Sequence, residues 1–377
     1  MLNVREINDF EEMKDSWNIL LERSQVNTNI FLTWEWLSTW WKHFGKGRKP
    51  LILIVEDEKN VLAIAPLMLS EYNLPLIGKT QRVEFIGTPD SDYHDFIIID
   101  KEAECLKLIF AYLQSNISNW NWIELKEVKE TTGTMDNFRY LAPELGEDLK
   151  IEERICNVCP YVTLPNSFES LMGSLKSNMR RHLKVSMRKI TQKYEVKLEK
   201  YDEAGFTVDA GMRTFASLFQ KRWATKGETG IFREGRDIEF LKFHMDVAQT
   251  FADKGWLGLY FLMANNEPIA AQYGFKYNRK MLCYLMGWNP AYSEYSVGNL
   301  SIMLLMRECI KEGFNEYDMM RGEEGYKIRW TDKCVRNYEV RFIQKDFPSR
   351  FYNWGFRSKT LNGLCQKIGF SLDLNQL

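Results

Sequence analysis

Two short hairpin patterns, one in each half of the chain, restrict the fold more than any other feature of the sequence. Residues 60–66 read Asn-Val-Leu-Ala-Ile-Ala-Pro, and residues 266–272 read Asn-Glu-Pro-Ile-Ala-Ala-Gln. Each segment lies at a turn between two apolar runs that are typical of strands. A helical pattern precedes each hairpin, and a further strand follows it. A supersecondary pattern that recurs within one chain indicates two copies of one α/β unit.

The remaining periodicity fits the same interpretation. Thr33 is a good N-cap for a helix that Gly45 ends. In the first half we predict helices at 9–23, 34–44 and 102–114 and strands at 51–55, 61–69, 82–87, 96–99 and 122–128. In the second half we predict strands at 256–264, 269–276, 280–288, 315–320 and 337–344, a helix at 298–312 and a closing helix at 347–369. The polar stretch 130–165 indicates the junction of two domains, 1–150 and 151–377.

The composition fits a protein with sizeable cores. Of 377 residues, 45% are hydrophobic and 14% aromatic, and the net charge is −1. This excludes a disordered chain and leaves no overall field toward nucleic acid or anionic membranes. No apolar run reaches the roughly 18 residues of a membrane span. Acidic residues occupy the N-terminus, where a signal peptide needs an apolar core. We therefore expect a soluble, cytoplasmic protein.

Neither the cysteines nor the histidines suggest a metal site. The seven cysteines are scattered, and Cys156 and Cys159 form a lone CxxC without a second pair. The four histidines lie far apart in the chain, whereas a structural zinc needs four ligands. We expect no metal and reduced, mostly buried thiols.

One segment, residues 284–332, carries the best candidate chemistry. The sequence lacks a GxSxG elbow, a GxxxxGK[ST] loop, HExxH and a GxGxxG after a strand, so covalent catalysis is not expected. Instead, a strand runs into a loop that ends at Gly298, where a helix begins. Helix N-termini bind phosphate through unpaired N–H groups, and glycine lets the backbone come close. The candidate cofactor-binding residues are therefore Val297, Gly298, Asn299 and Leu300, with an ordinary helix start as the alternative.

Charged residues gather where two predicted strands end. Asp318 and the run Arg321-Gly-Glu-Glu-Gly-Tyr-Lys327 follow an apolar strand directly. Loops at strand ends are exposed and held by a rigid scaffold, so such clusters often line binding sites. Residues 88–95, Thr-Pro-Asp-Ser-Asp-Tyr-His-Asp, stand in the same position in the first half. Asx residues and proline also make ordinary turns, so both segments could be solvated turns instead.

A basic helix is predicted between the two halves. Seven Lys or Arg residues and no acid lie between positions 176 and 193. Arg180, Lys184 and Arg188 share one helical face, opposite an apolar face. The basic face could meet a coenzyme A phosphate, a nucleotide diphosphate or an RNA stem. It could equally be a solvated face, whereas membrane binding is disfavoured because the apolar face lacks Trp and Phe.

Together these residues resemble a known family. The order hairpin, strand, loop-to-helix and strand resembles the core of the GNAT acyltransferases. The chain is most similar to the cellulose-biosynthesis (CelD-like) acetyltransferases, relatives of the Fem aminoacyltransferases. Its most specific matching piece is Tyr-Asp-Met-Met-Arg-Gly-Glu-Glu-Gly-Tyr-Lys-Ile-Arg-Trp, residues 317–330. The other pieces are residues 31–44, 62–67, 91–95, 180–188, 222–223, 268–271 and 297–298. The chain departs from the GNAT phosphate signature, which has Arg or Gln and a second Gly around position 298.

The resemblance implies an α/β (α+β) fold of two tandem GNAT-like units, each a mixed, mostly antiparallel sheet flanked by helices. It also implies direct attack of an acceptor amine or hydroxyl on an acyl-CoA thioester. Asp318 and Glu323 are then the candidate bases, with Asp92 reaching the cleft from the first unit, and Tyr326 is the candidate general acid. Substrate-binding candidates are Arg321, Lys327, Tyr93, Arg180 and Lys184.

These observations predict an acyl-CoA-dependent N- or O-acyltransferase, with acetyl-CoA or another acyl-CoA as co-substrate. We expect the acceptor to be a small molecule or glycan, such as an amino sugar or a polysaccharide or envelope precursor. The alternative within enzymes is a Fem-type aminoacyltransferase that uses aminoacyl-tRNA, although no long helical arm is inserted here. From another class, the chain could be a non-catalytic nucleic-acid-binding protein. The net charge and the absence of a recognised motif argue against this, and no DNA partner is expected.

Overall fold

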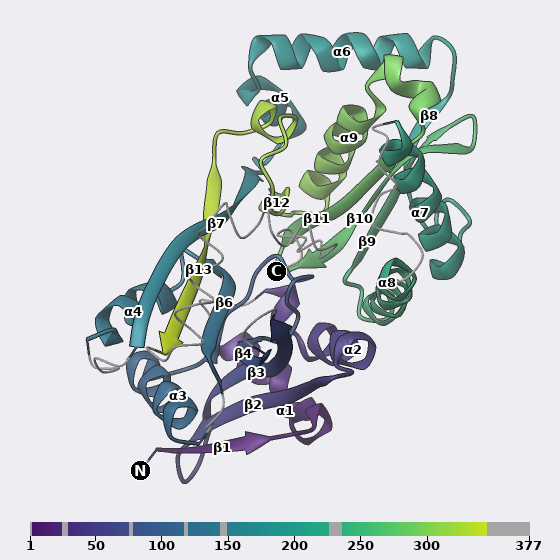
Figure 1. The fold of residues 1–377 in the computed structure, drawn as a ribbon. Helices are drawn as coiled ribbons and strands as arrows, with labels where there is room; N and C mark the ends of the chain where they lie inside the picture. Colours follow the sequence, from purple (N-terminus) through teal and green to yellow (C-terminus); the bar gives the residue numbers. More distant parts are fainter. Residues whose placement is uncertain are drawn as a thin grey trace. The chain divides into compact units, whose positions relative to one another are not determined.

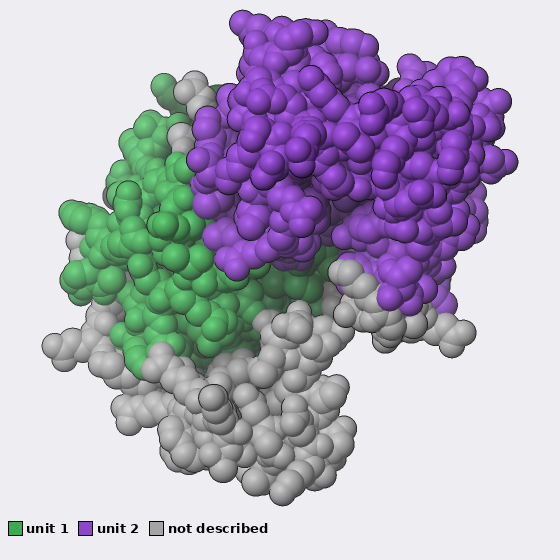
Figure 2. Space-filling model, turned by 90° about the horizontal axis from the view of Figure 1, so that it is seen from above, with its two compact units in different colours: residues 1–157, 336–377 green, residues 158–335 purple. Residues whose placement is uncertain are grey.

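The computed structural model describes residues 2–24, 29–74, 78–116, 120–143, 149–225 and 236–344 (Figure 1). The chain divides into two compact units (Figure 2). The first comprises residues 1–157 and 336–377, and the second comprises residues 158–335. Each is described by itself below.

The first unit is a mixed sheet with strand order β1-β2-β3-β4-β6-β13 followed by the start of β7. From β1 to β13, neighbouring strands are antiparallel except β4 and β6, which pair in parallel at Arg82↔Trp122 and Val83↔Ile123. The strands are β1 (Asn3–Ile7), β2 (Arg48–Glu56), β3 (Val61–Leu74), β4 (Gly78–Phe85), β6 (Trp122–Lys129), β7 (Leu149–Thr163) and β13 (Cys334–Gln344), and the short β5 (Ile97–Ile98) pairs with β3.

Helices of the first unit form where the sequence supplies caps and an apolar face. In α2 (Trp34–Phe44) the Thr33 side chain accepts a hydrogen bond from the Trp36 N–H, and the helix ends at Gly45. In α3 (Glu102–Asn116) the apolar face packs against β2 in the core. The other helical segments are η1 (Phe10–Met13), α1 (Lys14–Arg23), η2 (Ile30–Leu32) and α4 (Thr134–Leu141).

The second unit has the strand order β7-β12-β11-β10-β9-β8. Only β11 and β12 are parallel neighbours. Its strands, besides the end of β7, are β8 (Val196–Lys200), β9 (Leu257–Ala264), β10 (Glu267–Tyr277), β11 (Lys280–Trp288) and β12 (Glu316–Asp318). Its helical segments are α5 (Phe168–Ser174), α6 (Ser177–Thr191), α7 (Val208–Ala224), α8 (Arg236–Asp253), η3 (Pro290–Tyr295), α9 (Val297–Lys311) and η4 (Lys327–Arg329).

Two groups of helices cover this second sheet. The buried residues of α6 and α9, such as Leu183 and Leu304, form one core with β9 and β10. Helix α7 packs instead on β10 and β11. A Cβ placed at Gly287 of β11 would lie 2.4 Å from the main-chain nitrogen of Phe219, so only glycine permits this close crossing.

The two units repeat one topology, which confirms the predicted fold class of two GNAT-like units. In the first, an antiparallel series β1-β2-β3-β4 is followed by α3 and the parallel strand β6. In the second, β8-β9-β10-β11 is followed by α9 and the parallel strand β12. The repeated hairpins predicted from residues 60–66 and 266–272 are β2–β3 and β9–β10. One further antiparallel strand, β13 or β7, lies beside β6 or β12.

The units differ from the predicted division at 1–150 and 151–377. Strand β13, which the sequence assigned to the second domain, pairs with β6 of the first, for example Phe342 with Ile123. The predicted junction 130–165 holds α4 and the 15-residue strand β7. Strand β7 escaped prediction because most of its residues are exposed or half-buried and its charged residues hide the strand pattern. The predicted helix 347–369 lies outside the described residues.

Candidate active site

Strands β11 and β12 of the second unit pair briefly and then separate. They are paired at three positions, Lys280↔Glu316, Met281↔Tyr317 and Leu282↔Asp318. Beyond Leu282, β11 continues to Trp288 beside β10. We call the point of separation the fork. Past the fork, β12 no longer forms hydrogen bonds with the main-chain N–H and C=O groups of β11. These groups therefore need other hydrogen-bond partners.

After the fork, the chain that leaves β12 follows β7 instead of β11. The N–H of Met319 donates to the carbonyl of Pro160 over 2.9 Å, and the N–H of Gly322 donates to the carbonyl of Val158 over 2.9 Å. The residues from Met319 to Gly322 are thus drawn toward β7. The separation of β11 and β12 is therefore built into the hydrogen bonding of the sheet.

A buried polar cluster ties the fork to α9. The amide nitrogen of Gln272 on β10 donates to Oγ of Ser301 on α9 over 2.7 Å. Its amide oxygen accepts hydrogen bonds from the hydroxyl of Tyr317 on β12 and from the thiol of Cys283 on β11, 3.4 Å away. Burial raises the pKa of Tyr317 well above its usual value and that of Cys283 to about 11. Both groups are therefore neutral donors at neutral pH, and they hold three strands and one helix together.

The loop after β12 is held by its own side chains. Oδ1 of Asp318 accepts a hydrogen bond of 2.8 Å from the N–H of Met320, which adopts a left-handed conformation with φ 59°. Nζ of Lys327 donates to the carbonyls of Met320 and Arg321 over 3.1 and 2.7 Å. It also pairs with Glu324 over 2.9 Å. Residues 318–327 therefore form an ordered loop, and its two buried charged side chains bind its own backbone.

These contacts bear on the predicted roles. Asp318 and Lys327 are each 3% exposed and engaged within the loop, which the sequence did not indicate. Glu323 is exposed and Arg321 half-buried. The base roles of Asp318 and Glu323 and the substrate contacts of Arg321 and Lys327 stay predictions.

Tyr326 lies near the fork. Its side chain is half-buried and packs against the core of the second unit. Burial raises the pKa of the Tyr326 hydroxyl. The nearby Cys283 and Glu324 raise this pKa further, whereas the positive charge of Arg222 lowers it. At neutral pH the hydroxyl is thus protonated and can donate a proton or a hydrogen bond. Its role as general acid stays a prediction.

Arg222 is a residue of this region to which the sequence assigned no role. It is 9% exposed, and Nη1 donates to the carbonyl of Met286 over 2.6 Å. Its guanidinium carbon lies 4.1 Å from the ring centroid of Trp288. A signal was present, because Met212, Phe215, Phe219 and Arg222 follow helical spacing, which places an arginine on the buried face of α7.

Helix α9 begins without a side-chain cap. Ser296 at the N-cap position has φ 54° and ψ 42°, and its side chain makes no capping hydrogen bond. Oδ1 of Asn299, in the first turn, is buried without a hydrogen-bond partner among the residues that the structure describes. A Cβ at Gly298 would lie 3.5 Å from the ring of Trp288, an ordinary contact, so the chain itself does not require glycine there. Cofactor binding by residues 297–300 stays a prediction.

In the first unit, the predicted site residues Asp92 and Tyr93 are buried. They are 3% and 1% exposed. The carbonyl of Asp92 accepts a hydrogen bond of 2.8 Å from the amide of Asn337 on β13. Nζ of Lys129 lies 3.6 Å from the ring centroid of Tyr93. Their parts in catalysis and substrate binding stay predictions.

Two tryptophans of α2 hold the same loop. Nε1 of Trp36 donates to Oγ of Ser91 over 2.9 Å, and Nε1 of Trp40 donates to Oδ2 of Asp90 over 2.8 Å. Asp90 and Ser91 therefore face the protein interior, where indole N–H groups donate to them. Sequence reasoning missed this because a run of Asp, Ser and Pro also fits an exposed turn.

Asp95 ends this loop and is buried, with an exposure of 1%. Oδ1 accepts hydrogen bonds from the Thr134 hydroxyl and the Phe96 N–H over 2.6 and 2.8 Å. Oδ2 is buried and has no hydrogen-bond partner within the described part of the chain. Burial raises the pKa of Asp95 to about 7, despite these hydrogen bonds.

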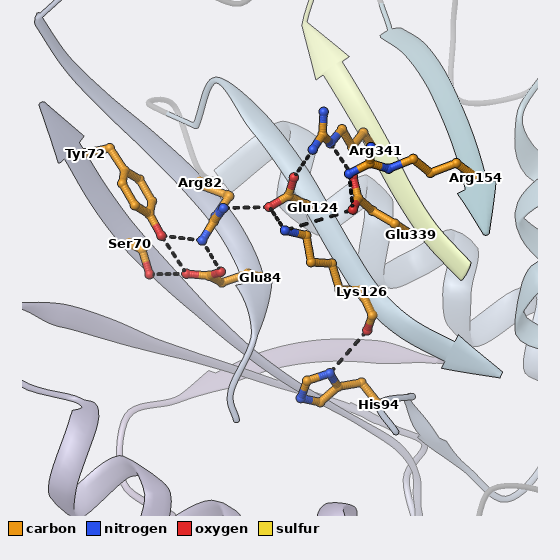
Figure 3. Close-up of polar contacts among 10 residues, drawn as sticks. All are labelled: Ser70, Tyr72, Arg82, Glu84, His94, Glu124, Lys126, Arg154, Glu339 and Arg341. Atoms are coloured by element: carbon orange, nitrogen blue, oxygen red, sulfur yellow. Dashed lines mark hydrogen bonds and ion pairs between the residues drawn. The ribbon is translucent and has the colours of Figure 1, made fainter. Parts of the chain in front are cut away.

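A network of ion pairs, centred on the buried carboxylates of Glu124 and Glu339, crosses the first sheet (Figure 3). Glu124 on β6 pairs with Arg82 on β4 and with Arg341 on β13, each over 2.6 Å. Glu339 pairs with Arg341 over 2.7 Å and with Arg154 over 2.8 Å. Burial alone would raise the pKa of Glu124, but Arg82, Lys126 and Arg341 lower it to about 2. Because these charges satisfy one another, we assign the network to the stability of the first unit.

The basic face of α6 is on the surface, as predicted. Met179, Leu183 and Ile190 enter the core, while Lys184 is exposed. Arg180 is half-buried, and its Nη1 lies 3.4 Å from the carbonyl of Gly173. A hollow on this face is lined by Ser177, Arg180, Arg181, Lys184, Val185 and Arg188. Which anion, if any, binds here stays a prediction.

Neither a metal cluster nor a membrane-spanning helix is found in the described ranges. There, no group of three or more His, Cys, Asp or Glu side chains could hold a metal ion. The six cysteines in these ranges are free thiols, and the Cys156 thiol donates to the carbonyl of Asn337. Within the same ranges, the helices are too short or too polar to cross a bilayer.

Comparison with known proteins identifies the second unit. Residues 177–328, from α6 to η4, match the acetyltransferase (GNAT) domain family. The second unit is a GNAT acetyltransferase domain. This domain makes the chain an acyltransferase. No curated protein matches the sequence.

Solved structures with similar folds cover nearly the whole chain. FemX is 12% identical with a TM-score of 0.62, over 93% of this chain and 99% of FemX. A conserved protein from Bacteroides thetaiotaomicron VPI-5482 is 10% identical with a TM-score of 0.53, over 91% of this chain and 100% of that protein. A tandem GNAT protein of the clavulanic acid biosynthesis pathway is 7% identical with a TM-score of 0.50, over 90% of this chain and 98% of that protein. At these identities the likeness concerns the fold, and the CelD-like resemblance stays an expectation.

Proposed function

We propose that the second unit transfers an acyl group from acyl-CoA to an amine or hydroxyl acceptor at the fork. The observation that carries the proposal is the separation of β11 from β12 after Leu282, with α9 beginning shortly after β11 ends. An extended ligand arm could take hydrogen bonds from the main-chain groups that β11 does not share with β12. The first turn of α9 could hold its phosphates.

The start of α9 supports a bound donor. The side chain of Ser296 does not cap the helix, and Oδ1 of Asn299 is a buried acceptor without a donor among the described residues. An acyl-CoA offers both complements, because its pyrophosphate accepts from N–H groups and its pantetheine amides donate. We propose acetyl-CoA as the donor, rather than a longer acyl-CoA, because residues 177–328 match an acetyltransferase family.

The chemistry needs no covalent enzyme intermediate. The acceptor nitrogen or oxygen attacks the thioester carbonyl and gives a tetrahedral oxyanion, which main-chain N–H groups of β11 past the fork would stabilise. Collapse breaks the carbon–sulfur bond, and the leaving thiolate takes the proton of Tyr326. A carboxylate accepts the proton of the acceptor. Among the two candidates in this unit, Glu323 is exposed and can pass the proton to water, whereas Asp318 is buried and holds the Met320 N–H.

The acceptor class rests on the resemblance carried by residues 317–330. That resemblance favours an amino sugar or a polysaccharide or envelope precursor. A cytoplasmic location agrees with acyl-CoA as donor.

A second candidate donor, an aminoacyl-tRNA, is favoured by one observation. Lys184 and Arg188 on α6 are exposed and make no ion pair among the described residues. Exposed cations along one helix can bind the phosphate backbone of a tRNA. The affinity for tRNA would then fall steeply as the salt concentration rises. Salt-dependent binding of tRNA, lost in Lys184→Glu with Arg188→Glu, would favour this donor. The absence of tRNA binding would exclude it.

A direct experiment separates the two donors. Acetyl-CoA is titrated into the protein by calorimetry, and release of the CoA thiol is then followed with a panel of amino sugars and other amines and alcohols. We expect saturable binding of acetyl-CoA and acceptor-dependent thiol release. If neither CoA nor acetyl-CoA binds, the proposed function is wrong.

A further inference from the structure

The guanidinium of Arg222 combines burial with an incomplete set of hydrogen bonds. Its side chain is 9% exposed, and Nη1 donates a hydrogen bond to the carbonyl of Met286. Nε is buried and has no hydrogen-bond partner, and no carboxylate lies within ion-pair distance of Arg222 in the described ranges. Met286 lies on β11 beyond the fork, so this cation stands beside the main chain that β12 leaves uncovered.

This arrangement has a physical cost. A buried charge without a partner costs several kcal/mol, and a buried N–H without an acceptor adds to that cost. Stacking on Trp288, with the guanidinium carbon 4.1 Å from its ring centroid, offsets part of it. An arginine stays protonated in proteins, so neutralisation cannot remove the rest. A bound anion would remove the remaining cost, because it would pair with the buried charge and accept from Nε.

The geometry of the guanidinium limits which anion fits. Since Nη1 is occupied, the free edge is the one formed by Nε and Nη2. These two parallel donors match the two oxygens of a carboxylate or a phosphate. The charge of Arg222 also interacts with Tyr326, Glu324 and Cys283, all at or near the fork. The free edge therefore belongs to the site where acyl transfer is proposed.

We propose that Arg222 is the anion-binding residue of this site and holds a carboxylate or phosphate group of a bound substrate. The inference rests on the proposed function. It adds that one substrate is anionic close to the reacting groups. The anion comes either from a phosphate of the acyl-CoA donor or from an acidic acceptor, such as a carboxylated or phosphorylated sugar or an amino acid.

A purely structural role for Arg222 is the competing explanation. The bond to Met286 and the stacking on Trp288 would by themselves fix α7 to the end of β11. Neither contact neutralises the charge, however. Nε of Arg82 and of Arg341 in the first unit also makes no hydrogen bond within the described ranges, but each of these arginines pairs with the carboxylate of Glu124. Arg222 has no such carboxylate among the described residues.

Thermal unfolding in the presence of simple anions tests the proposal. Wild-type protein and the variants Arg222→Gln and Arg222→Lys are titrated with inorganic phosphate and with acetate, against chloride at equal ionic strength. Arg213→Gln, which removes an exposed arginine of the same helix, is the matched control. We expect phosphate or acetate to raise the midpoint temperature of wild type and Arg213→Gln through binding to the native state. Arg222→Gln should lose the effect, and Arg222→Lys should show an apparent affinity about tenfold to hundredfold weaker.

Two outcomes overturn the proposal. One is a wild-type midpoint that responds to phosphate and acetate no more than to chloride. The other is an anion response that Arg222→Gln or Arg222→Lys retains in full. If Arg222→Gln does not fold, the comparison of Arg222→Lys with wild type still decides.

Calorimetry with CoA identifies the source of the anion. If Arg222→Lys weakens CoA binding by about tenfold or more, the anion is a donor phosphate. If CoA affinity is unchanged while the anion response of the CoA-bound protein is lost, the anion belongs to the acceptor. A wild-type protein that binds phosphate through Arg222 but never CoA would refute the proposed function and leave the anion site in place.

Discussion

Arg222 on α7 donates a hydrogen bond of 2.6 Å to the carbonyl of Met286 on β11. Through this bond a helix supports the stretch of β11 that has parted from β12. The ring of Trp288, two residues further along β11, stacks on the same guanidinium. One cation of α7 therefore holds two residues of β11 just past the fork.

Tyr326→Phe tests the general acid with little change in packing. We expect kcat to fall by about 10²–10⁴-fold, because the leaving thiolate loses its proton donor. CoA affinity measured by calorimetry should stay near that of wild type. Tyr194→Phe, another half-buried tyrosine of the second unit, is the matched control and should keep full turnover. Full turnover in Tyr326→Phe would remove this residue from the mechanism.

Gly298→Val tests donor binding at α9. The chain itself leaves room for a Cβ here, 3.5 Å from the ring of Trp288, so the unfolding temperature should change little. A bulky side chain should nevertheless keep the donor from the first turn and weaken CoA binding. Gly173→Val, where a Cβ meets no atom within 4 Å, controls for the loss of a helical glycine. Unchanged CoA affinity in a folded Gly298→Val protein would count against the site.

The sequence could predict those elements whose signals are local. Strand β11 was predicted with the bounds observed, Lys280 to Trp288, because an apolar run there is bordered by turn residues. Helix α2 was predicted because Thr33 and Gly45 mark its ends. The fork depends on which strand takes the main-chain bonds of residues 319–322. That choice falls to β7, which has no clear strand pattern, so no local signal encodes it.

The candidate site shows the same limit. The charged residues at the end of a strand predicted its loop. They did not predict which groups these charged side chains contact. Lys327 binds two carbonyls of its own loop, a contact that depends on the left-handed turn at Met320. The carbonyl of Asp92 accepts its hydrogen bond from the amide of Asn337 on β13, which lies 245 residues away in the chain. Such long-range partners leave no trace in spacing or periodicity.

Asp95→Asn should change how stability depends on pH. Burial raises the pKa of Asp95 to about 7 in the native state, from 3.8 as the reference value. Between these values the native state binds a proton that the unfolded state has lost, so this group makes stability fall as pH rises, by at most about 1.4 kcal/mol per pH unit. The amide that Asp95→Asn introduces cannot ionise, and the variant should gain stability relative to wild type between pH 5 and pH 8.

The measurement is the midpoint of denaturant unfolding at several pH values, with the exposed Asp332→Asn as a surface control. A difference between Asp95→Asn and wild type that does not vary with pH would show that Asp95 titrates normally.

Glu124→Gln should destabilise the first unit strongly. Removing this carboxylate leaves the buried guanidinium of Arg82 and the partly buried guanidinium of Arg341 without one of their partners, which costs about 3–5 kcal/mol. The pH dependence has the opposite sign to that of Asp95. The pKa of Glu124 is lowered to about 2 from 4.5, so its stabilisation is present above pH 4.5 and is lost as pH falls toward 2. Unfolding of wild type and variant should therefore converge in acid, and parallel curves would contradict the assignment.

Lys327→Met separates two roles for one ammonium group. In the structure, Nζ binds the carbonyls of Met320 and Arg321, and its burial leaves it 3% exposed. The variant should therefore release the loop after β12, seen as faster amide hydrogen exchange in residues 319–327. Because Tyr326 belongs to this loop, kcat should fall together with loop order, while exchange in α9 stays as in wild type. Unchanged exchange together with a higher KM for an anionic acceptor would instead mean that Lys327 binds the substrate, as the sequence predicted.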